Sequence, residues 1–480
     1  RYISDLDPAY FSARTLRIKS PLATGKTELF KRIIAHFERT HGRAPTVLYQ
    51  THSQPLVNDA AARLGIQSYQ DVPVDEPSRH YIDLMPQLAI TLDSLHLVSG
   101  REFDLIFIDE FEQNMAHIYG GTMQGQQAKQ AFNTFTDLLD TAGQVVLADA
   151  HLTDNLLPFI TRYRGSDGLV SVDNSYRPDR GTLTLWKDSA ALIEQALDHA
   201  HRAQHPIVIT SNSRTQTDLL HRIFAEALGS EAVFLINGDN SAHTTRKAFL
   251  NDINTQIATK RVVICSPTIG TGIDIQTRVS AVYGLFGRNT WGSATVTLQQ
   301  MMRFRHADER HLYVQPTFNG TEESNPLNRF NWHLARARGT GRAAAFAEHH
   351  LLSDDTPHRT LLMIECIQKS ARATQRNELF SYTVAYAQDE GFTLAYCEQE
   401  SPLMRATLRE ARQALAEVQK ENALTLPPVD SDTFDSLLQS GQVDRTVRHQ
   451  LLRWQIERTA GQAITGELYA LLHTPRKRAD

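Results

Sequence analysis

Two short motifs, one beginning at Ser20 and one at Asp109, constrain this chain more than any other feature of its sequence. The first reads Ser-Pro-Leu-Ala-Thr-Gly-Lys-Thr over residues 20–27, follows a short alternating strand pattern and opens an amphipathic helix pattern. That context is typical of a phosphate-binding loop, whose backbone N–H groups and helix N-terminus surround a phosphate. Lys26 would reach the β- and γ-phosphates of a nucleotide, and the Thr27 hydroxyl would bind Mg²⁺.

The second motif, Asp-Glu-Phe-Glu over residues 109–112, follows a continuous apolar segment at residues 103–108. Because that segment predicts a buried strand, Asp109 should lie at the strand's carboxyl end, where it can bind the same Mg²⁺. Glu110 beside it would orient the attacking water. The two motifs together predict an ATPase with ATP and Mg²⁺ as cofactors and with Lys26, Asp109 and Glu110 as catalytic residues.

The phosphate-binding loop departs from the general pattern G-x-x-x-x-G-K-[ST] at its start. Ser20 replaces the first glycine, and Ala23 stands where many such loops have a second one. Alanine tolerates positive φ and the close approach of a phosphate less well than glycine does. One interpretation is a degraded, inactive loop, but the intact Gly25-Lys26-Thr27 favours an active one. The predicted nucleotide site includes Ser20, Ala23, Thr24, Gly25, Lys26 and Thr27.

Alternating strand and helix patterns predict an α/β fold with two parallel-sheet lobes. In the first half, polar residues follow strand patterns at Thr51-His52, at Asp93-Ser94 and at Asp149-Ala150-His151. Such strand ends meet at one edge of a parallel sheet. A polar stretch with proline and glycine at residues 174–181 predicts a hinge. The second lobe repeats the alternation, with strands expected at residues 207–210, 233–236, 262–266, 282–286 and 312–314.

Two later motifs complete the order of motifs along the chain. Gly-Thr-Gly-Ile-Asp occupies residues 270–274, and Gln-x-x-x-Arg-x-Arg runs from Gln299 to Arg305 in a segment expected to be helical. With the earlier motifs, this order resembles superfamily 2 helicases. It is most similar to herpesvirus-type origin-binding helicases and to the helicase domains of plasmid and phage primase–helicase replication proteins. The resemblance covers residues 14–320.

The resemblance implies two tandem RecA-like lobes, at residues 1–177 and 178–324, followed by a mostly helical accessory domain at 325–480. It implies that Gln299, Arg303 and Arg305 act in catalysis, with Arg303 the first candidate for an arginine finger. Gly270, Gly272 and Asp274 match the turn that touches both the ATP ribose and the nucleic-acid backbone. The predicted nucleic-acid-binding residues are Thr51, His52, Ser94, Ser211, Asn212, Thr268 and Thr271.

Several of these residues have simpler interpretations. Thr51, Ser94 and Ser211 could be ordinary helix N-caps. His151 could be a satisfied polar residue at a strand end instead of a group that couples two sites. Met302 stands where many relatives have glycine, which bears on the local packing and leaves the arginine chemistry intact.

The length and composition agree with a two-lobed protein and give no sign of an overall basic charge or of a disulfide framework. The 480 residues give room for two lobes and a third unit, and the formal net charge of −5 provides no overall basic field. A helicase does not need one, because its cleft can grip phosphates locally. Three widely spaced cysteines give neither a zinc pattern nor a disulfide framework, which favours a cytoplasmic location, in the host cytosol or nucleoid for a plasmid or phage protein. We expect no membrane association.

The third unit reads as mostly helical. Ser401-Pro402 predicts a helix start, and apolar residues then recur at positions 404, 408, 411, 415 and 418 with arginines on neighbouring faces. The helix could contact DNA or a partner, or it could be a bundle helix with a solvated face. A second helix is expected around Trp454. The chain begins with Arg1 instead of Met, so we expect an upstream region, and the resemblance suggests a primase-type or other replication module there.

These observations predict an ATP-dependent DNA helicase or translocase that acts in plasmid, phage or mobile-element replication on single-stranded or forked DNA. The resemblance implies 3′→5′ movement. One alternative is an origin- or partner-binding scaffold in which a weak ATPase serves as a conformational switch. Another is an RNA-directed helicase, because a cleft that grips the backbone does not by itself distinguish DNA from RNA.

Overall fold

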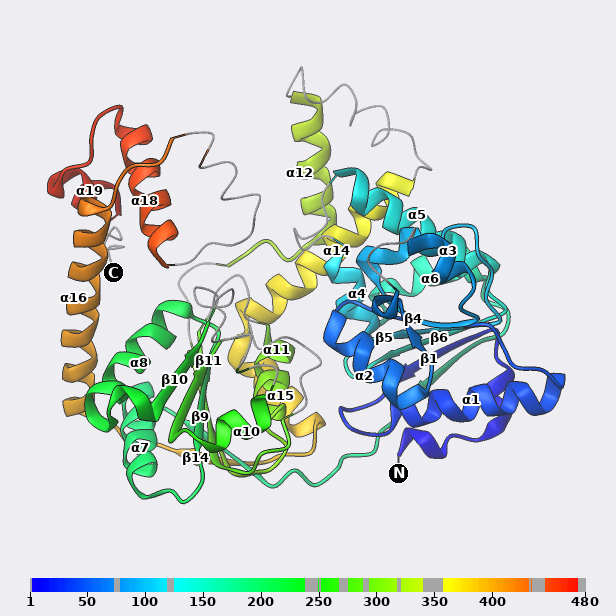
Figure 1. The fold of residues 1–480 in the computed structure, drawn as a ribbon, viewed down its shortest axis with the longest axis horizontal. Helices are drawn as coiled ribbons and strands as arrows, with labels where there is room; N and C mark the ends of the chain where they lie inside the picture. Colours follow the sequence, from blue (N-terminus) through cyan, green and yellow to red (C-terminus); the bar gives the residue numbers. More distant parts are fainter. Residues whose placement is uncertain are drawn as a thin grey trace.

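The computed structural model describes residues 2–72, 78–118, 125–237, 249, 252–266, 275–287, 293–316, 321–339, 357–430, 433 and 445–473. Figure 1 shows two α/β lobes beside each other, with further helices that begin after the second lobe. Every described strand pair in the two sheets is parallel. The predicted fold class, two tandem RecA-like lobes followed by a mainly helical part, is confirmed.

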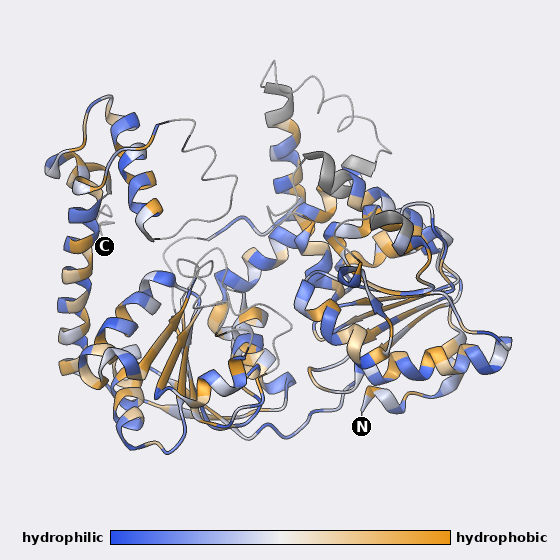
Figure 2. Ribbon diagram, in the orientation of Figure 1, coloured by the Kyte–Doolittle hydropathy of each residue, from blue (hydrophilic) through white to orange (hydrophobic). Residues whose placement is uncertain are grey.

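The first lobe is built on a seven-stranded sheet with the strand order β3-β4-β2-β5-β6-β1-β7. Its strands are β1 (Thr15–Lys19), β2 (Val47–Thr51), β3 (Gln67–Ser68), β4 (Gln87–Thr91), β5 (Leu105–Asp109), β6 (Gln144–Asp149) and β7 (Leu169–Asp173). The central strands β2, β5 and β6 are buried along almost their whole length and are mostly apolar, because helices cover both faces of the sheet. Figure 2 shows this as hydrophobic strands between helices that are hydrophobic on one side.

Two hydrophobic cores flank the first sheet, one on each face. The core on one face includes residues of α1 and α2, and the other includes residues of α4, α5 and α6. The helices of this lobe are α1 (Lys26–His41), α2 (Gln54–Leu64), α3 (Ser78–Asp83), α4 (Phe111–His117), α5 (Gly125–Thr141) and α6 (Leu157–Arg164). Short 3-10 turns are η1 (Ile3–Asp5), η2 (Pro8–Ser12), η3 (Tyr69–Asp71), η4 (Leu92–Val98) and η5 (Asp154–Leu156).

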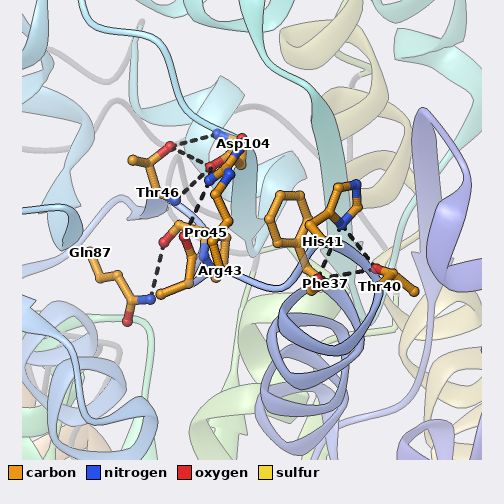
Figure 3. A network of polar contacts seen from close by, with 9 residues as sticks. Phe37, Thr40, His41, Arg43, Pro45, Thr46, Gln87 and Asp104 are labelled. Atoms are coloured by element: carbon orange, nitrogen blue, oxygen red, sulfur yellow. Dashed lines mark hydrogen bonds and ion pairs between the residues drawn. The ribbon is translucent and has the colours of Figure 1, made fainter.

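A polar network ties the amino ends of β2 and β5 together (Figure 3). Both terminal guanidinium nitrogens of Arg43 donate to the carboxylate of Asp104, each at 2.7 Å, and the backbone N of Thr46 donates to the same carboxylate at 2.8 Å. These contacts lower the pKa of Asp104 to about 2, with the Arg43 hydrogen bond as the largest cause. The network helps to fix the register in which Tyr49 pairs with Phe107. That register brings Tyr49 near Asp109.

The second lobe has its own seven-stranded sheet, in the order β10-β11-β9-β12-β13-β8-β14. Its strands are β8 (Thr182–Trp186), β9 (Ile207–Ser211), β10 (Val233–Ile236), β11 (Val262–Cys265), β12 (Val279–Phe286), β13 (Ala307–Val314) and β14 (Thr393–Cys397). One core lies under α7 (Ser189–Arg202), α8 (Arg214–Leu228) and α16 (Pro402–Thr425). The other lies under α10 (Ile253–Ala258), α11 (Ala294–Met302) and α15 (Leu379–Asp389). A short turn, η6 (Ser230–Ala232), precedes β10.

The chain after residue 325 packs against both lobes. Helix α12 (Pro326–Gly339) packs on α14 (Pro357–Asn377), and α14 also packs on α4 and α5 of the first lobe. Strand β14 then pairs with β8 of the second lobe. The predicted domain limits at residues 177 and 324 stay a prediction.

Helix α16 begins where the sequence indicated. The Ser401 hydroxyl accepts a hydrogen bond from the backbone N of Met404 at 3.2 Å, and Pro402 is the first helical residue. Met404 and Leu408 are buried against the second lobe, whereas Arg409 is exposed. This supports the interpretation of a bundle helix with a solvated face. Its far end packs with α18 (Arg445–Ala460) and α19 (Gly466–His473), which confirms the helix predicted around Trp454.

Two smaller expectations can be compared with the structure. Cys265, Cys366 and Cys397 are all free thiols. Among the described helices, none has the length and apolar character that crossing a bilayer requires.

Candidate nucleotide site between the lobes

A cavity of about 700 Å³ opens between the two lobes. The first lobe contributes residues from the loop after β1, from α2 and from the carboxyl ends of β2 and β5. The second contributes the end of α11 and the turn into β13. Of the residues predicted from the sequence, those that line the cavity are Ala23, Thr27, Asp109, Glu110, Gln299, Arg303 and Arg305.

The loop between β1 and α1 is closed by side-chain hydroxyl groups. The Thr24 hydroxyl donates to the carbonyl oxygen of Pro21 at 2.6 Å, and the Ser20 and Thr24 hydroxyl oxygens are 2.6 Å apart. Asn174 at the start of the hinge donates to the Ser20 hydroxyl at 2.9 Å. Ser20 therefore does more than replace a glycine, because its side chain braces the loop against the hinge.

Lys26 and Gly25 lie as a phosphate-binding loop requires. The Lys26 ammonium group donates to the carbonyl oxygens of Ser20 and Pro21 at 3.2 and 3.4 Å, which folds the side chain over the loop. Gly25 has φ +92°, and a Cβ there would lie 3.1 Å from the Ser4 hydroxyl oxygen. Glycine is needed at this position for both reasons. Thr27 follows in the first turn of α1.

Ala23 is in the left-handed region, with φ 59°. The sequence indicated that glycine would suit this position better, and the backbone conformation agrees. A side chain with a Cβ in this region costs about 1–2 kcal/mol. The loop therefore stores strain beside the phosphate-binding residues.

Replacing Ala23 with glycine is expected to stabilise the protein by about 0.5–1 kcal/mol, because the relieved strain exceeds the extra freedom of the unfolded chain. Urea unfolding monitored by circular dichroism measures this difference. Ala13, with φ −63°, is the matched control, and Ala13→Gly should destabilise the protein. Equal destabilisation by both variants would contradict the assignment of strain to Ala23.

Two residues, Tyr49 and Asn114, hold the Asp109-Glu110 turn through three hydrogen bonds. The Tyr49 hydroxyl donates to the Asp109 carboxylate at 2.7 Å, and Tyr49 is buried. The amide of Asn114 donates to the carbonyl oxygens of Asp109 and Glu110 at 2.5 and 3.1 Å. Glu110 itself has φ 54° and ψ 51°, a strained conformation of the kind that clusters at functional sites.

Burial raises the pKa of Glu110 to about 8, and the nearby carboxylates of Asp109 and Asp149 add to the effect. Its side chain is 19% exposed, and its Oε2 atom is buried without a hydrogen bond in the described part of the protein. The His52 Nδ1 atom lies 3.6 Å from that oxygen. Burial, with His117 and Arg303 nearby, lowers the pKa of His52 to about 4. His52 therefore faces Glu110 as a neutral ring near pH 7.

The second lobe brings its arginines to the same cavity, although not on the predicted helix. Helix α11 ends at Met302, Arg303 is its C-cap, and Arg305 lies in the following turn. The helical assignment of Arg303 and Arg305 was therefore wrong, because the chain leaves α11 to enter β13. Arg303 is half-buried and interacts electrostatically with Glu110. Gln113 of α4 donates to the Gln299 side chain at 3.1 Å, which joins the lobes directly.

The predicted nucleic-acid residues have varied surroundings. Thr51 and Ser211 are fully buried, and Ser94 lies inside η4, where its hydroxyl accepts from Thr91 at 3.2 Å. The N-cap positions of α2 and α8 are Ser53 and Ser213, so the helix-cap interpretation is wrong for all three residues.

Asn212 exchanges two hydrogen bonds with the backbone of Gly287, at 2.5 and 3.1 Å. Thr268, Gly270, Thr271, Gly272 and Asp274 lie outside the described residues. The nucleic-acid roles of this whole set stay predictions.

Three residues that sequence reasoning missed hold the site together. Tyr49 and Asn114 fix the Asp109-Glu110 turn. Arg180 of the hinge donates to the carbonyl oxygen of Leu22 at 2.7 Å and forms an ion pair with Glu390 at 3.0 Å. The sequence carried a signal only for Arg180, which lies in the predicted hinge.

The side chains around the cavity fit a magnesium–nucleotide complex. Thr27, Asp109 and Glu110 offer the hydroxyl and carboxylate oxygens that Mg²⁺ prefers. Lys26, Arg303 and Arg305 offer cations suited to phosphate oxygens. Among the residues that the structure describes, none donates a hydrogen bond to the buried Oε2 atom of Glu110 at this cavity.

Comparisons with known proteins support the resemblance predicted from the motifs. Residues 78–229 match the model of a family described as origin of replication binding protein. The chain is 25% identical over 281 residues to a candidate replication origin-binding protein of Acanthamoeba polyphaga mimivirus, which covers 54% of this chain and 32% of that protein. It is 23% identical over 283 residues to a candidate helicase/primase complex protein of African swine fever virus, covering 58% of this chain and 25% of that protein.

The first curated relative, an uncharacterized protein of Picosynechococcus sp., is 26% identical over 359 residues, which is 66% of this chain and 34% of that protein. The chain thus spans about a third or less of the length of these relatives. A solved structure of Mss116p bound to ssRNA and AMP-PNP aligns with 92% of this chain and 82% of its own, with a TM-score of 0.50 and 11% identity. That likeness shows a shared fold. The chain resembles superfamily 2 helicases of the origin-binding type.

Proposed function

We propose that this chain is an ATP-dependent DNA helicase or translocase that moves 3′→5′ on single-stranded or forked DNA during plasmid, phage or mobile-element replication. One observation carries the proposal. Lys26 belongs to a phosphate-binding loop in the first lobe, and Glu110 and Arg303, from different lobes, line one cavity beside that loop. An ATPase whose catalytic groups sit on two lobes couples hydrolysis to lobe movement.

Each side chain has a distinct task in this proposal. Lys26 exchanges its loop carbonyls for the β- and γ-phosphates, and Thr27 and Asp109 would hold Mg²⁺, which neutralises charge on the phosphates when bound. Glu110 orients the attacking water and accepts its proton. Arg303 stabilises the charge that develops at the γ-phosphate. Gln299, joined to Gln113, and Arg305 complete the second-lobe side of the site.

The proposed DNA substrate is supported by the matching family and the relatives, which are described as origin-binding and helicase/primase complex proteins. We infer that the nucleic acid lies across the carboxyl ends of both sheets, near Thr51, His52, Ser94, Ser211 and Asn212. Thr268 and Thr271 are proposed to bind it as well. A primase-type or other replication module is the proposed partner. The proposed location is the cytoplasm, or the nucleoid or host cytosol for a plasmid or phage protein.

A second candidate function is supported by the strained Ala23. A phosphate-binding loop with a strained backbone could bind ATP yet turn it over slowly, as in a scaffold that uses nucleotide as a conformational switch. Repeated turnover stimulated by single strands separates a motor from a switch.

Lys26→Ala is expected to abolish ATP turnover while the protein keeps its thermal transition, because the ammonium group is the point charge that the loop offers to the phosphates. The measurement is phosphate release with and without single-stranded DNA or RNA, followed by strand displacement on tailed duplexes. Lys31→Ala is the matched control, since Lys31 lies on the same helix and pairs with Glu28 at 3.1 Å. Turnover within a fewfold of wild type in Lys26→Ala would remove the phosphate-loop assignment.

A further inference from the structure

Helix α14 links the two lobes, and its first half places a buried glutamine against the first lobe. The helix packs on α4 and α5, and its Ile364 belongs to a core of the first lobe. Figure 1 shows α14 beginning near α4 and α5 of the first lobe and ending near α11 and α15 of the second. Gln368 is 8% exposed, and its amide donates to the Oε2 atom of Glu112 at 2.6 Å.

Glu112 is the residue that joins the Asp109-Glu110 turn to the segment after β6. Its Oε1 atom accepts hydrogen bonds from the backbone N and the hydroxyl of Thr153 at 2.9 and 2.7 Å. Its own backbone N donates to the buried carboxylate of Asp149 at 2.9 Å. One carboxylate thus fixes two segments of the candidate site, and Gln368 occupies its remaining oxygen.

The segment that follows α14 touches the same site again. Tyr386 of α15 lies against His151, with ring centroids 4.9 Å apart. Glu390, just after α15, holds Arg180, which in turn donates to the carbonyl oxygen of Leu22 in the phosphate-binding loop. Residues 368–390 therefore contact the first lobe at Glu112 and His151 and reach its phosphate-binding loop through Arg180. The partner of Gln368, Glu112, is only two residues from Glu110.

We propose that Gln368 is a positioning residue for ATP hydrolysis, through which helix α14 fixes Glu112 and, with it, the turn that carries Asp109 and Glu110. Gln368 does not line the cavity, so it acts through Glu112 and not on the nucleotide. This inference rests on the proposed ATPase function. It adds a contact from beyond the helicase-like motifs, by which the third unit influences turnover.

The test asks whether Gln368 acts by its hydrogen bond to Glu112 or only by filling space. It does so by exchanging the donor and the acceptor of that hydrogen bond. Gln368→Leu removes the donor at similar size, and Gln368→Glu places a second carboxylate against Glu112. Both variants should lower kcat about 10–100-fold, which is the scale typical of residues that hydrogen-bond to catalytic groups and orient them. Both should leave the KM for ATP within about twofold of wild type. In the double variant Glu112→Gln/Gln368→Glu, the amide at 112 can donate to the carboxylate at 368 and still accept from Thr153. It should recover most of the lost kcat.

Gln375→Leu is the matched control, because Gln375 lies on the same helix and donates to the Tyr386 hydroxyl at 3.5 Å instead of to Glu112. Thermal melts verify folding, and if Gln368→Leu unfolds, the comparison of Gln368→Glu with the double variant answers the same question. A normal kcat in folded Gln368→Leu overturns the inference, as does a loss that the double variant fails to recover. Absence of ATPase activity in the wild type would instead contradict the proposed function itself.

Discussion

Replacing Arg303 with alanine is expected to lower ATP turnover by roughly a thousandfold, the scale on which arginine fingers contribute. Arg303 lies at the end of α11 in the second lobe and lines the cavity that Glu110 lines from the first. Its guanidinium group already interacts with the Glu110 carboxylate. Because Lys26 and Thr27 remain in place, affinity for ATP should stay near that of wild type. Turnover and equilibrium binding of a labelled nucleotide measure the two effects separately.

Two further variants identify the chemistry that Arg303 supplies. Arg303→Lys should not restore turnover, because a point charge cannot span two phosphate oxygens as a planar guanidinium does. Arg305→Ala should have a smaller effect, since Arg305 lies in the exposed turn after the helix. If Arg303→Ala keeps its DNA-stimulated activity, Arg305 is the finger or the lobes do not close around ATP. If both alanine variants remain active, the coupled two-lobe motor is the wrong model.

Glu110→Gln is expected to bind ATP with Mg²⁺ at near-normal affinity and to hydrolyse it about a hundred to ten thousand times more slowly. That range is typical for loss of a general base. The amide keeps the shape of the side chain but cannot accept a proton from water. Nucleotide binding measured beside single-turnover hydrolysis tests this. Lost binding with normal residual chemistry would mean that Glu110 has a structural role only.

The same variant should stabilise the protein when metal and nucleotide are absent. The folded protein raises the pKa of Glu110 to about 8, above its ordinary value of 4.5. Protonated Glu110 therefore favours the folded state, and this contribution is lost as pH rises through the folded pKa. Glu110→Gln removes that loss, so its melting temperature in EDTA should exceed that of wild type by a margin that grows between pH 5 and pH 8 and levels off above pH 8. With an unfolding entropy of about 2.1 cal/mol/K per residue, each kcal/mol raises the melting temperature of this 480-residue chain by about 1 °C. A gap that does not grow with pH would contradict the raised pKa.

The central strands of both sheets and the edge strand β10 were predictable, whereas the other edge strands and β8 next to β14 were not. Strands β5 and β12 are apolar because neighbouring strands and helices bury them on both faces. Strands β7, β8 and β14 lie at or next to an edge and leave several residues exposed, so no continuous apolar run marks them. The return of the chain to the second lobe at β14 depends on pairing between distant segments, which a local pattern does not reveal.

The residues of the candidate site likewise fall into those that the sequence could predict and those that it could not. Lys26, Asp109 and Glu110 were predicted to lie together because the carboxyl ends of parallel strands share an edge, and the structure brings them together. The contacts that Tyr49, Asn114 and Gln368 make are set by strand register and helix packing. Their side chains meet the site from β2, α4 and α14. His52 was expected at the nucleic-acid face, yet it lies against Glu110. Arg303 and Arg305 were predicted from the resemblance to helicases, because their spacing in the sequence does not by itself indicate that they lie near the first lobe.

Strand β14 also determines when the protein can finish folding as it is synthesised. The first sheet is complete in sequence at Asp173, whereas the second needs Thr393–Cys397 to cover the free side of β8. Until those residues leave the ribosome, or in any fragment cut at residue 324, β8 presents unpaired backbone groups to other chains. Such an edge invites aggregation. A fragment meant to isolate the two lobes must therefore extend to residue 397.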